Sequence, residues 1–350
     1  MKTLIYLGVI LGTVILLFGG FILYSMLTWY DPPQKLTLAE NAKPDPINCD
    51  STLSVLSWNI GYAGLGDDMD FFYDGGKKVR GSYERTVVNL DSISHFLKQN
   101  SSKSFTLIQE IDLHSRRSYY LNELNTLTTE TSYFSSLAPN YVVGFVPVPP
   151  SSPMGQVNSG IMTLSQYLPT NSIRYAYPGT FGWPNRLFNL RRCMLVNRYP
   201  TSNGKELVLI NSHMSAFDDG SLKKREMLYL KEFILIEHSL GNYVVVGGDW
   251  NQSPPNFPVT RFGENFQSES FLLTNIAEYF MPADWNWVFD PEFPTNRYLN
   301  ETYTPGHTFR CLIDMFLVSP NVEVLHNKTI DLSFRNSDHN PIEMNFRLIK

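Results

Sequence analysis

The chain alternates between short apolar runs and polar turns over most of its length, after one long apolar segment at its start. Many of these runs have the length and the β-branched and aromatic content of buried strands. They are residues 53–58, 105–109, 141–148, 160–164, 193–197, 207–212, 243–247, 312–318, 322–325 and 342–348. Segments 82–98 and 222–240 repeat apolar residues at helical spacing. Dominant strands with helices between some of them predict an α/β fold of two packed sheets flanked by helices.

The first segment predicts a membrane anchor. Residues 3–30 carry no charged side chain, and about 20 apolar residues suffice for a helix to cross a bilayer. The alternative is a cleaved signal peptide, which has a shorter apolar region followed by a small-residue cleavage site. Residues 21–30 offer no good site of that kind. We therefore expect an uncleaved single-pass helix, and Lys2 favours a catalytic body outside the cytoplasm, periplasmic or extracellular.

The remainder divides into a short connection and one body. Residues 31–52 contain several prolines and no periodic apolar pattern, so we interpret them as a spacer. No linker, repeat or low-complexity tract interrupts residues 53–350. The expected organisation is an anchor over 1–30, a spacer over 31–52 and a single catalytic domain over 53–350.

The composition excludes few classes of function, but it makes tight binding to nucleic acid a weaker expectation. The formal net charge is −5, so no general basic field draws the protein to nucleic acid, although a bound divalent cation would supply local positive charge. The cysteines Cys49, Cys193 and Cys311 share no close spacing, which argues against a zinc cluster. A disulfide between Cys193 and Cys311 and buried free thiols both remain open.

Polar residues that can bind a metal or move a proton follow the predicted strands. Asn59 and Glu110 each come directly after an apolar run, and carboxylate and amide oxygens suit a hard cation such as Mg²⁺. Asp249 and Asn251 flank Trp250, so in an extended chain both side chains face the same way. Taken singly, each of these residues is as well explained as a turn residue or a solvated acid.

Three further positions complete the pattern. His339, preceded by Asp338, suits a general base near neutral pH, and Asp314 is the candidate carboxylate that fixes its tautomer. His213 also follows a strand, where it can donate a proton to a leaving oxygen or bind phosphate. A structural or loop histidine is the ordinary alternative for His213.

Asn, Glu, Asp with Asn, Asp, and Asp with His at successive strand ends resemble the endonuclease/exonuclease/phosphatase superfamily, and the resemblance covers residue 53 to the C-terminus. It implies a four-layer α/β/β/α sandwich of two mainly antiparallel sheets. It also implies that Asn59 and Glu110 bind Mg²⁺, with Mn²⁺ as a possible substitute, and that Asp338 assists the metal. Asp249 and Asn251 would orient water and phosphate, and Asp314 would support His339. His213 matches a histidine that many members carry.

The expected activity is therefore that of a membrane-anchored phosphodiesterase acting by water attack. Its substrate would be a lipid headgroup, a small phosphodiester or nucleic acid, and the anchor and the acidic charge slightly favour the first two. A membrane-tethered nuclease is the nearest alternative, and a catalytically silent binding scaffold is the alternative from another class. Nothing in the sequence indicates a protein partner.

Two loops and several arginines are secondary candidates. Residues 61–76 are expected to form a substrate-facing lip, and residues 145–153 a rigid wall. The candidate phosphate-binding cations are Arg186, Arg191 and Arg192, with Arg80 and Arg85 as more distant choices.

Overall fold

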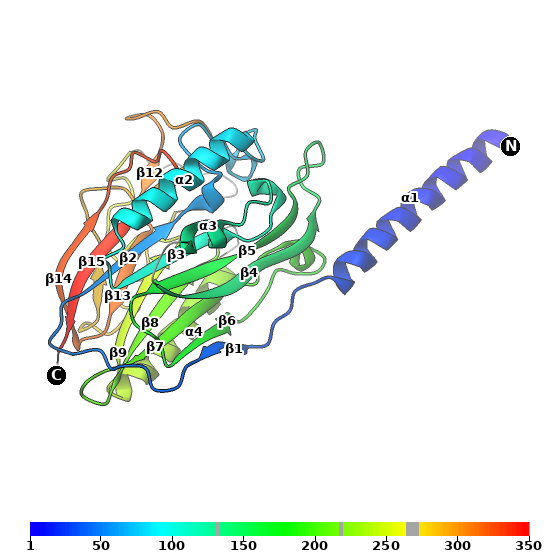
Figure 1. The fold of residues 1–350 in the computed structure, drawn as a ribbon. Helices are drawn as coiled ribbons and strands as arrows, with labels where there is room; N and C mark the ends of the chain where they lie inside the picture. Colours follow the sequence, from blue (N-terminus) through cyan, green and yellow to red (C-terminus); the bar gives the residue numbers. More distant parts are fainter. Residues whose placement is uncertain (130–132, 217–219, 264–272, 350) are drawn as a thin grey trace.

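The computed structural model describes residues 1–129, 133–216, 220–263 and 273–349. It shows a body of two β-sheets packed face to face, with helices on the outside and one long helix, α1 (Lys2–Leu27), projecting from one end (Figure 1). The four-layer α/β/β/α sandwich expected from the resemblance is thereby confirmed.

The first sheet has seven strands in the spatial order β1-β6-β7-β8-β9-β13-β10. They are β1 (Lys35–Glu40), β6 (Asn171–Ala176), β7 (Cys193–Pro200), β8 (Glu206–His213), β9 (Tyr243–Asp249), β13 (Asp314–Val318) and β10 (Asn286–Val288). Every neighbouring pair is antiparallel except β8 and β9, which lie near the middle and run parallel.

The second sheet has six strands in the order β14-β15-β2-β3-β5-β4. They are β14 (Val322–Thr329), β15 (Ile342–Leu348), β2 (Leu53–Asn59), β3 (Phe105–Asp112), β5 (Gly155–Ser165) and β4 (Phe134–Val146). Here too only the central pair, β2 and β3, is parallel. A separate ribbon pairs β11 (Asn296–Arg297) with β12 (Arg310–Cys311).

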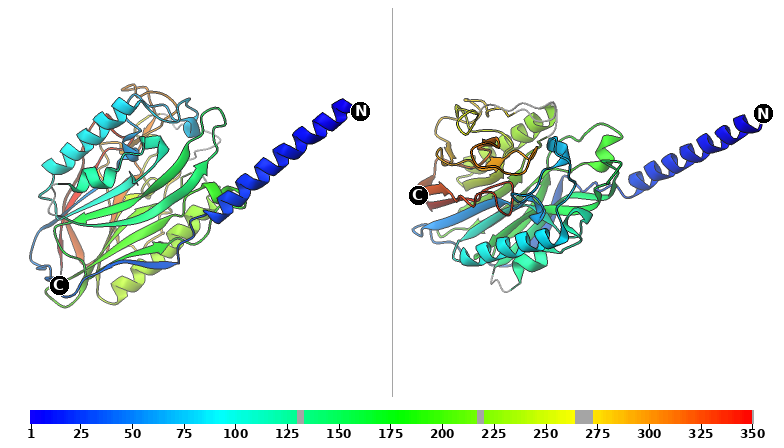
Figure 2. Two further views of the ribbon diagram at one scale, coloured as in Figure 1. Left: turned by 45° about the vertical axis from the view of Figure 1, so that its right-hand side comes forward. Right: turned by 90° about the horizontal axis from the view of Figure 1, so that it is seen from above.

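Helices cover the outer face of each sheet (Figure 2). On the six-stranded sheet these are α2 (Tyr83–Gln99) and α3 (Glu123–Thr128), and on the seven-stranded sheet α4 (Ser221–Ser239). Short 3-10 turns are η1 (Gly61–Ala63), η2 (Phe72–Asp74), η3 (Arg116–Ser118) and η4 (Asn185–Phe188). α2 begins where the sequence predicts, because the Ser82 hydroxyl accepts a hydrogen bond from Arg85 N.

Three apolar layers hold the sandwich together. Inward residues of both sheets, among them Leu107, Val245 and Phe316, form the central layer. Trp58 and its neighbours pack under α2 and α3, and a third cluster that includes Leu230 packs under α4. Alternate strand residues therefore face the central layer and the helices, so strands buried on both faces appear in the sequence as continuous apolar runs.

The chain between α1 and the body is more ordered than a spacer. Residues Lys35–Glu40 form β1, which pairs with β6 at the edge of the seven-stranded sheet. Leu36 and Leu38 turn toward the body and are half-buried, whereas Lys35 and Thr37 are exposed. A single edge strand needs only this short alternation of exposed and half-buried residues. The prolines on either side of it make the segment resemble a spacer in the sequence.

The helix α1 carries the apolar composition expected of a membrane span. It has 26 residues, and among the described residues it is the one helix long and apolar enough to cross a bilayer. Its length and composition also fit a signal sequence. All three cysteines are buried as free thiols.

Candidate active site

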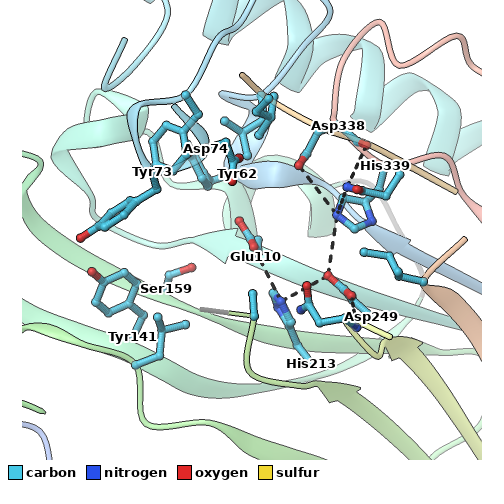
Figure 3. A pocket seen from close by; sticks show the side chains of 18 of the residues that line it. Tyr62, Tyr73, Asp74, Glu110, Tyr141, Ser159, His213, Asp249, Asp338 and His339 are labelled. Carbon is cyan, nitrogen blue, oxygen red and sulfur yellow. Dashed lines mark hydrogen bonds and ion pairs between the residues drawn. The ribbon is translucent and has the colours of Figure 1, made fainter. Parts of the chain in front are cut away.

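The two parallel strand pairs bring four candidate side chains to one end of the sandwich. Asn59 ends β2 and Glu110 lies near the end of β3, while His213 and Asp249 end β8 and β9 and are paired with each other in the sheet register. Because each pair runs parallel, its carboxyl ends share an edge, and the packed sheets place those edges opposite each other. Figure 3 shows Glu110, His213, Asp249 and His339 converging there.

A β-bulge turns Glu110 into this pocket. The pairing of β3 with β5 shifts register between Ile108 and Ile111, and Glu110 has a φ of 55°. The preceding Gln109 stays in the core, where its amide donates to Asn211 Oδ1 at 2.8 Å. The bulge thus sends adjacent side chains in different directions, and the Glu110 side chain retains 26% of its exposure.

The turn after β9 is tighter than an extended chain. Gly248 has a φ of 142°, and a Cβ there would lie 1.9 Å from the Ser212 carbonyl oxygen, so only glycine fits. Asn251 has a φ of 49°, and its backbone N–H donates to Asp249 Oδ1 at 2.9 Å. The expected extended arrangement of Asp249 and Asn251 is therefore wrong, although both side chains line the pocket. The Asn251 amide donates to the Met214 carbonyl at 2.9 Å.

Asp314 and His339 form the pair that the sequence predicts. His339 Nδ1 lies 2.8 Å from Asp314 Oδ2, and both side chains are buried. β13 pairs with β9 so that Asp314 stands opposite Asp249. The other ring nitrogen of His339, Nε2, faces the pocket, 3.7 Å from Asp249 Oδ2 and 3.8 Å from Asp338 Oδ2.

Hydrogen bonds tie the last motif of the chain to the first. The Trp58 indole N–H donates to the His339 carbonyl at 2.9 Å, and the Ser337 hydroxyl donates to the Asn59 carbonyl at 2.8 Å. Asn59 in turn donates from Nδ2 to Asp249 Oδ2 at 3.1 Å. Residues far apart in the sequence are therefore held in one rigid constellation.

His213 completes the group. Its Nε2 lies 3.3 Å from Asp249 Oδ2 and 3.9 Å from Glu110 Oε1. All eight sequence candidates are accounted for, since Asn59, Glu110, His213, Asp249, Asn251, Asp314, Asp338 and His339 meet at this one end of the sandwich.

Burial gives the acidic side chains unusual proton affinities. It raises the pKa of Asp338 to about 6, with Glu110 adding to the effect and His339 opposing it. It raises the pKa of Asp249 to about 6, opposed by His339 and reinforced by Asp314. Asp74, which the sequence did not single out, also lines the pocket, and burial raises its pKa to about 7.

The oxygen-rich composition of this site suits a divalent cation. Asp249, Asp314 and His339 have potential ligand atoms within 4.8 Å of one another. In that set, however, Asp314 and His339 already bond each other. Glu110 and Asp338 are acidic groups in one pocket, and Glu110 raises the pKa of Asp338, so a cation between them would relieve a real charge conflict.

The pocket has a volume of about 180 Å³ and a largely apolar wall. The wall includes Tyr62, Leu65, Phe71, Tyr73, Tyr141, Met154 and Leu190. Loop 61–76 therefore forms part of the pocket as expected. In Figure 3, Tyr73 and Tyr141 lie on the side opposite Asp338 and His339. Loop 145–153, the expected wall, does not line the pocket.

Of the arginines suggested by the sequence, only Arg192 lines the pocket. Arg186 and Arg191 instead lie over the ring of Trp29, while Arg80 donates to the Arg116 carbonyl and Arg85 pairs with Asp67 and Asp68.

Sequence reasoning missed Arg117 and Arg297, which also line the pocket. Arg117 is buried in an ion pair with Asp112 at 2.9 Å and lies 3.7 Å from the centre of the Tyr62 ring. Because the neighbouring Arg116 has the same local sequence context, no sequence signal distinguished Arg117 from it.

Asn296 was also missed. Its Nδ2 lies 2.9 Å from His339 Nε2, and its Oδ1 accepts from the Cys311 thiol at 3.5 Å. The thiol contact orients the amide with its nitrogen toward the imidazole. Asn296 lies in the short ribbon β11–β12, whose two-residue strands leave no periodic pattern to detect.

The fold is that of an α/β protein with two mixed sheets, and acids, amides and histidines gather at the ends of its parallel strands. The chain belongs to the endonuclease/exonuclease/phosphatase family, whose profile matches residues 56–339. Members of this family are divalent-metal-dependent phosphoesterases and nucleases. No curated protein matches the chain.

Solved structures share the fold at low sequence identity. An endonuclease/exonuclease/phosphatase from Beutenbergia cavernae superposes with a TM-score of 0.57 at 15% identity, covering 85% of this chain and 72% of that one. TDP2 from D. rerio, complexed with a single-strand DNA product, gives 0.52 at 17% identity, covering 85% and 100%. The human Nocturnin catalytic domain gives 0.51 at 14%, covering 91% and 99%.

Proposed function

We propose that this protein is a membrane-anchored, Mg²⁺-dependent phosphodiesterase that cleaves its substrate by attack of water. The observation that carries the proposal is the bond of 2.8 Å between His339 Nδ1 and Asp314 Oδ2, with His339 Nε2 turned toward Asp249 and Asp338. A histidine held in this way presents one ring nitrogen to the pocket in a fixed tautomer.

His339 acts as the general base. Its Nδ1–H is donated to Asp314, so Nε2 is the atom that takes the proton from water. The Asn296 amide nitrogen lies 2.9 Å from Nε2 and can donate to it while His339 is neutral. Asp249, within reach of both histidines, orients the water. The Asn251 amide donates one hydrogen to the Met214 carbonyl, and its second hydrogen points to a phosphate oxygen.

Asn59, Glu110 and Asp338 would hold the metal, with Mn²⁺ as a possible substitute for Mg²⁺. A bound dication would neutralise charge that develops on the phosphoryl oxygens and would offset the carboxylates around His339. His213, which is buried beside Arg192, stays neutral and donates a hydrogen bond to phosphate or to the leaving oxygen.

Glu110→Gln tests the metal site directly. The full chain in detergent micelles is assayed on bis(4-nitrophenyl) phosphate with Mg²⁺, with Mn²⁺ and with chelator. We expect chelator to abolish turnover and Glu110→Gln to lower it by roughly 10²–10³-fold, because the charge that holds the metal is lost.

Glu278→Gln, a change at an exposed glutamate far from the pocket in sequence, is the matched control and should keep wild-type turnover. Undiminished turnover in chelator or in Glu110→Gln contradicts the metal-dependent mechanism. A wild-type chain that binds Mg²⁺ but turns over no phosphodiester supports the silent-scaffold alternative instead.

The membrane part of the proposal rests on α1 and on residues 31–52, which lead from α1 through the edge strand β1 to β2 of the catalytic body. We place α1 as a single-pass anchor and, following Lys2, the body on the periplasmic or extracellular side. Protease accessibility of the body in intact cells tests this placement, and a body protected until the membrane is opened contradicts it.

A further inference from the structure

The C-terminal part of α1 is packed against the body. The ring of Phe21 stacks on Phe188 of η4, with centroids 5.6 Å apart and planes 7° from parallel, and it meets Phe145 of β4 edge-on at 6.0 Å. The Tyr24 side chain packs closely on Gly144 of β4, where an added Cβ would lie 2.6 Å from the Tyr24 hydroxyl and would push that side chain aside. The helix therefore leaves the body in a defined direction (Figures 1 and 2).

The residues that follow α1 continue the contact. The ring of Trp29 lies 4.8 Å from the guanidinium of Arg186 and 5.4 Å from that of Arg191. Asp31 forms an ion pair with Arg191, and the chain then enters β1. From Phe21 to the edge of the sheet, the anchor is attached at successive points.

The segment that receives α1 is also a wall of the pocket. Phe188 contacts α1, whereas Leu190 and Arg192, a few residues further on, line the pocket. The Tyr141 hydroxyl, on another lining residue, donates to the Phe188 carbonyl at 3.1 Å. Phe188 and Leu190 both pack on the apolar cluster that includes Phe71 and Met154, so apolar surface runs from the helix to the pocket.

Exposed apolar side chains lie near the same end. Trp183, two residues before η4 begins, keeps 61% of its surface exposed, and Phe145 at the end of β4 and Val148 of the β4–β5 loop keep 36% each. Figure 1 shows this loop on the side of the body from which α1 projects. Large apolar side chains of this kind, beside the end of a membrane helix, fit the interfacial region of a bilayer.

We propose that the pocket takes the phosphoester headgroup of a membrane lipid from the bilayer that holds α1, an inference that rests on the proposed function. The docked helix fixes the body close to the bilayer, with Trp183 and Val148 at its surface. The lipid headgroup enters along the wall of Leu190 and Tyr141, and Arg192 meets its phosphate.

The reaction is hydrolysis. The oxygen of water forms a new bond to phosphorus, one ester P–O bond breaks, and the leaving alcohol takes the proton that the water gives up. A nucleic acid would need an extended basic surface, and the chain has a net charge of −5 and a pocket wall that is aromatic and aliphatic.

Turnover of membrane lipid, of a soluble diester and of plasmid DNA by the same protein tests this inference. The full chain is reconstituted in vesicles of phosphatidylcholine with equal parts of phosphatidylethanolamine, phosphatidylglycerol and sphingomyelin. Release of water-soluble phosphate ester or of lipid alcohol is followed with Mg²⁺, beside turnover of bis(4-nitrophenyl) phosphate and plasmid DNA. We expect lipid hydrolysis by the wild-type chain.

Trp183→Ser serves as the discriminating variant. We expect it to lower lipid turnover at least fivefold and to leave turnover of the soluble diester within twofold, because Trp183 lies outside the pocket lining. Trp183→Phe keeps an apolar ring and should restore lipid turnover. Tyr279→Ser, at an aromatic residue that is even more exposed, is the matched control and should change neither activity.

The outcomes separate the two proposals. Turnover of the soluble diester without lipid hydrolysis overturns the lipid inference and leaves the phosphodiesterase standing, and so does nicking of plasmid without lipid hydrolysis. Equal loss on both substrates in Trp183→Ser overturns the role of the bilayer-facing surface. No turnover of any substrate removes the proposed function and this inference with it.

Discussion

The two histidines of the pocket are both buried and both lie beside Asp249, yet their surroundings favour the protonated form of one and the neutral form of the other. Burial alone would lower the pKa of His339, but nearby carboxylates, first that of Asp314, outweigh it and raise that pKa well above the ordinary range. For His213, burial and then the positive charge of Arg192 lower the pKa well below that range.

Hydrogen bonds sharpen the same contrast. Nδ1 of His339 bonds to Asp314, whereas no described residue bonds Nδ1 of His213. One imidazole is therefore built to carry a proton and the other to stay neutral. Residue type and burial alone do not decide the charge of a histidine, because the balance between burial and the neighbouring charges sets its pKa.

Loss of the proton-accepting histidine should have the largest effect on turnover. His339→Gln is expected to lower the turnover of a soluble phosphodiester by roughly 10³–10⁴-fold, since glutamine cannot accept the proton of water. Steady-state kinetics with saturating Mg²⁺ measure this. His326→Gln, at an exposed histidine in β14, should behave as wild type, and a loss in His339→Gln of less than tenfold would show that another group is the base.

Removing the partner carboxylate should reduce turnover less. Asp314→Asn keeps the shape of the side chain but removes the charge that favours protonated His339, and we expect a loss of roughly 10²–10³-fold. The acidic limb of the pH–rate profile should also move to lower pH, because the main cause of the raised pKa of His339 is gone. An unchanged limb would mean that Asp314 does not set the proton affinity of His339.

The effect of pH on metal affinity should be smaller than the losses of turnover in these two variants. Asp338 has a pKa of about 6, so below that pH a cation must displace its proton, and apparent Mg²⁺ affinity should fall by up to about tenfold per pH unit. Calorimetric titration at pH 5.5 and 7.5 measures this change. Asp284→Asn, at an exposed acid, should keep the wild-type dependence, and equal affinities at both pH values would exclude Asp338 as a ligand.

The depressed pKa of His213 should affect mainly the pH dependence of the free energy of unfolding. The unfolded state binds a proton at His213 below its ordinary pKa of about 6.5, while the folded state does not, because its pKa is depressed. Stability is therefore lost as pH falls, by up to about 1.4 kcal/mol for each pH unit below 6.5.

Urea unfolding at pH 7.5 and 5.5 isolates this contribution. In His213→Gln the fall in the free energy of unfolding between the two pH values should be smaller than in wild type by about that amount. His326→Gln should retain the full wild-type fall. An identical fall in wild type and His213→Gln would show that His213 takes up a proton in the folded protein.

Most of the fold could be predicted because its buried strands appear as apolar runs in the sequence. The acids and histidines of the site could be predicted because they stand at the ends of those runs. Asn59, Asp249 and His213 end strands whose burial is visible as apolar runs, and a parallel pair has only one edge for its carboxyl ends. Glu110 was found for the same reason, although the bulge that aims it leaves no mark in composition.

What escaped prediction depends on contacts rather than on local pattern. Asn296 reaches His339 from a two-residue strand, and Arg117 is held by Asp112 and by the ring of Tyr62. Arg186 and Arg191 were suggested as phosphate ligands but are engaged with Trp29. Charge alone does not reveal which arginine is turned inward.

The edge strand β1 has a practical consequence for producing this protein. A shortened chain that started at Leu53 would leave the whole length of β6 with unpaired N–H and C=O groups, which are a template for intermolecular pairing. Such a chain should aggregate during recombinant expression. A chain that starts between Asp31 and Lys35 would discard the apolar helix but keep the sheet closed at that side.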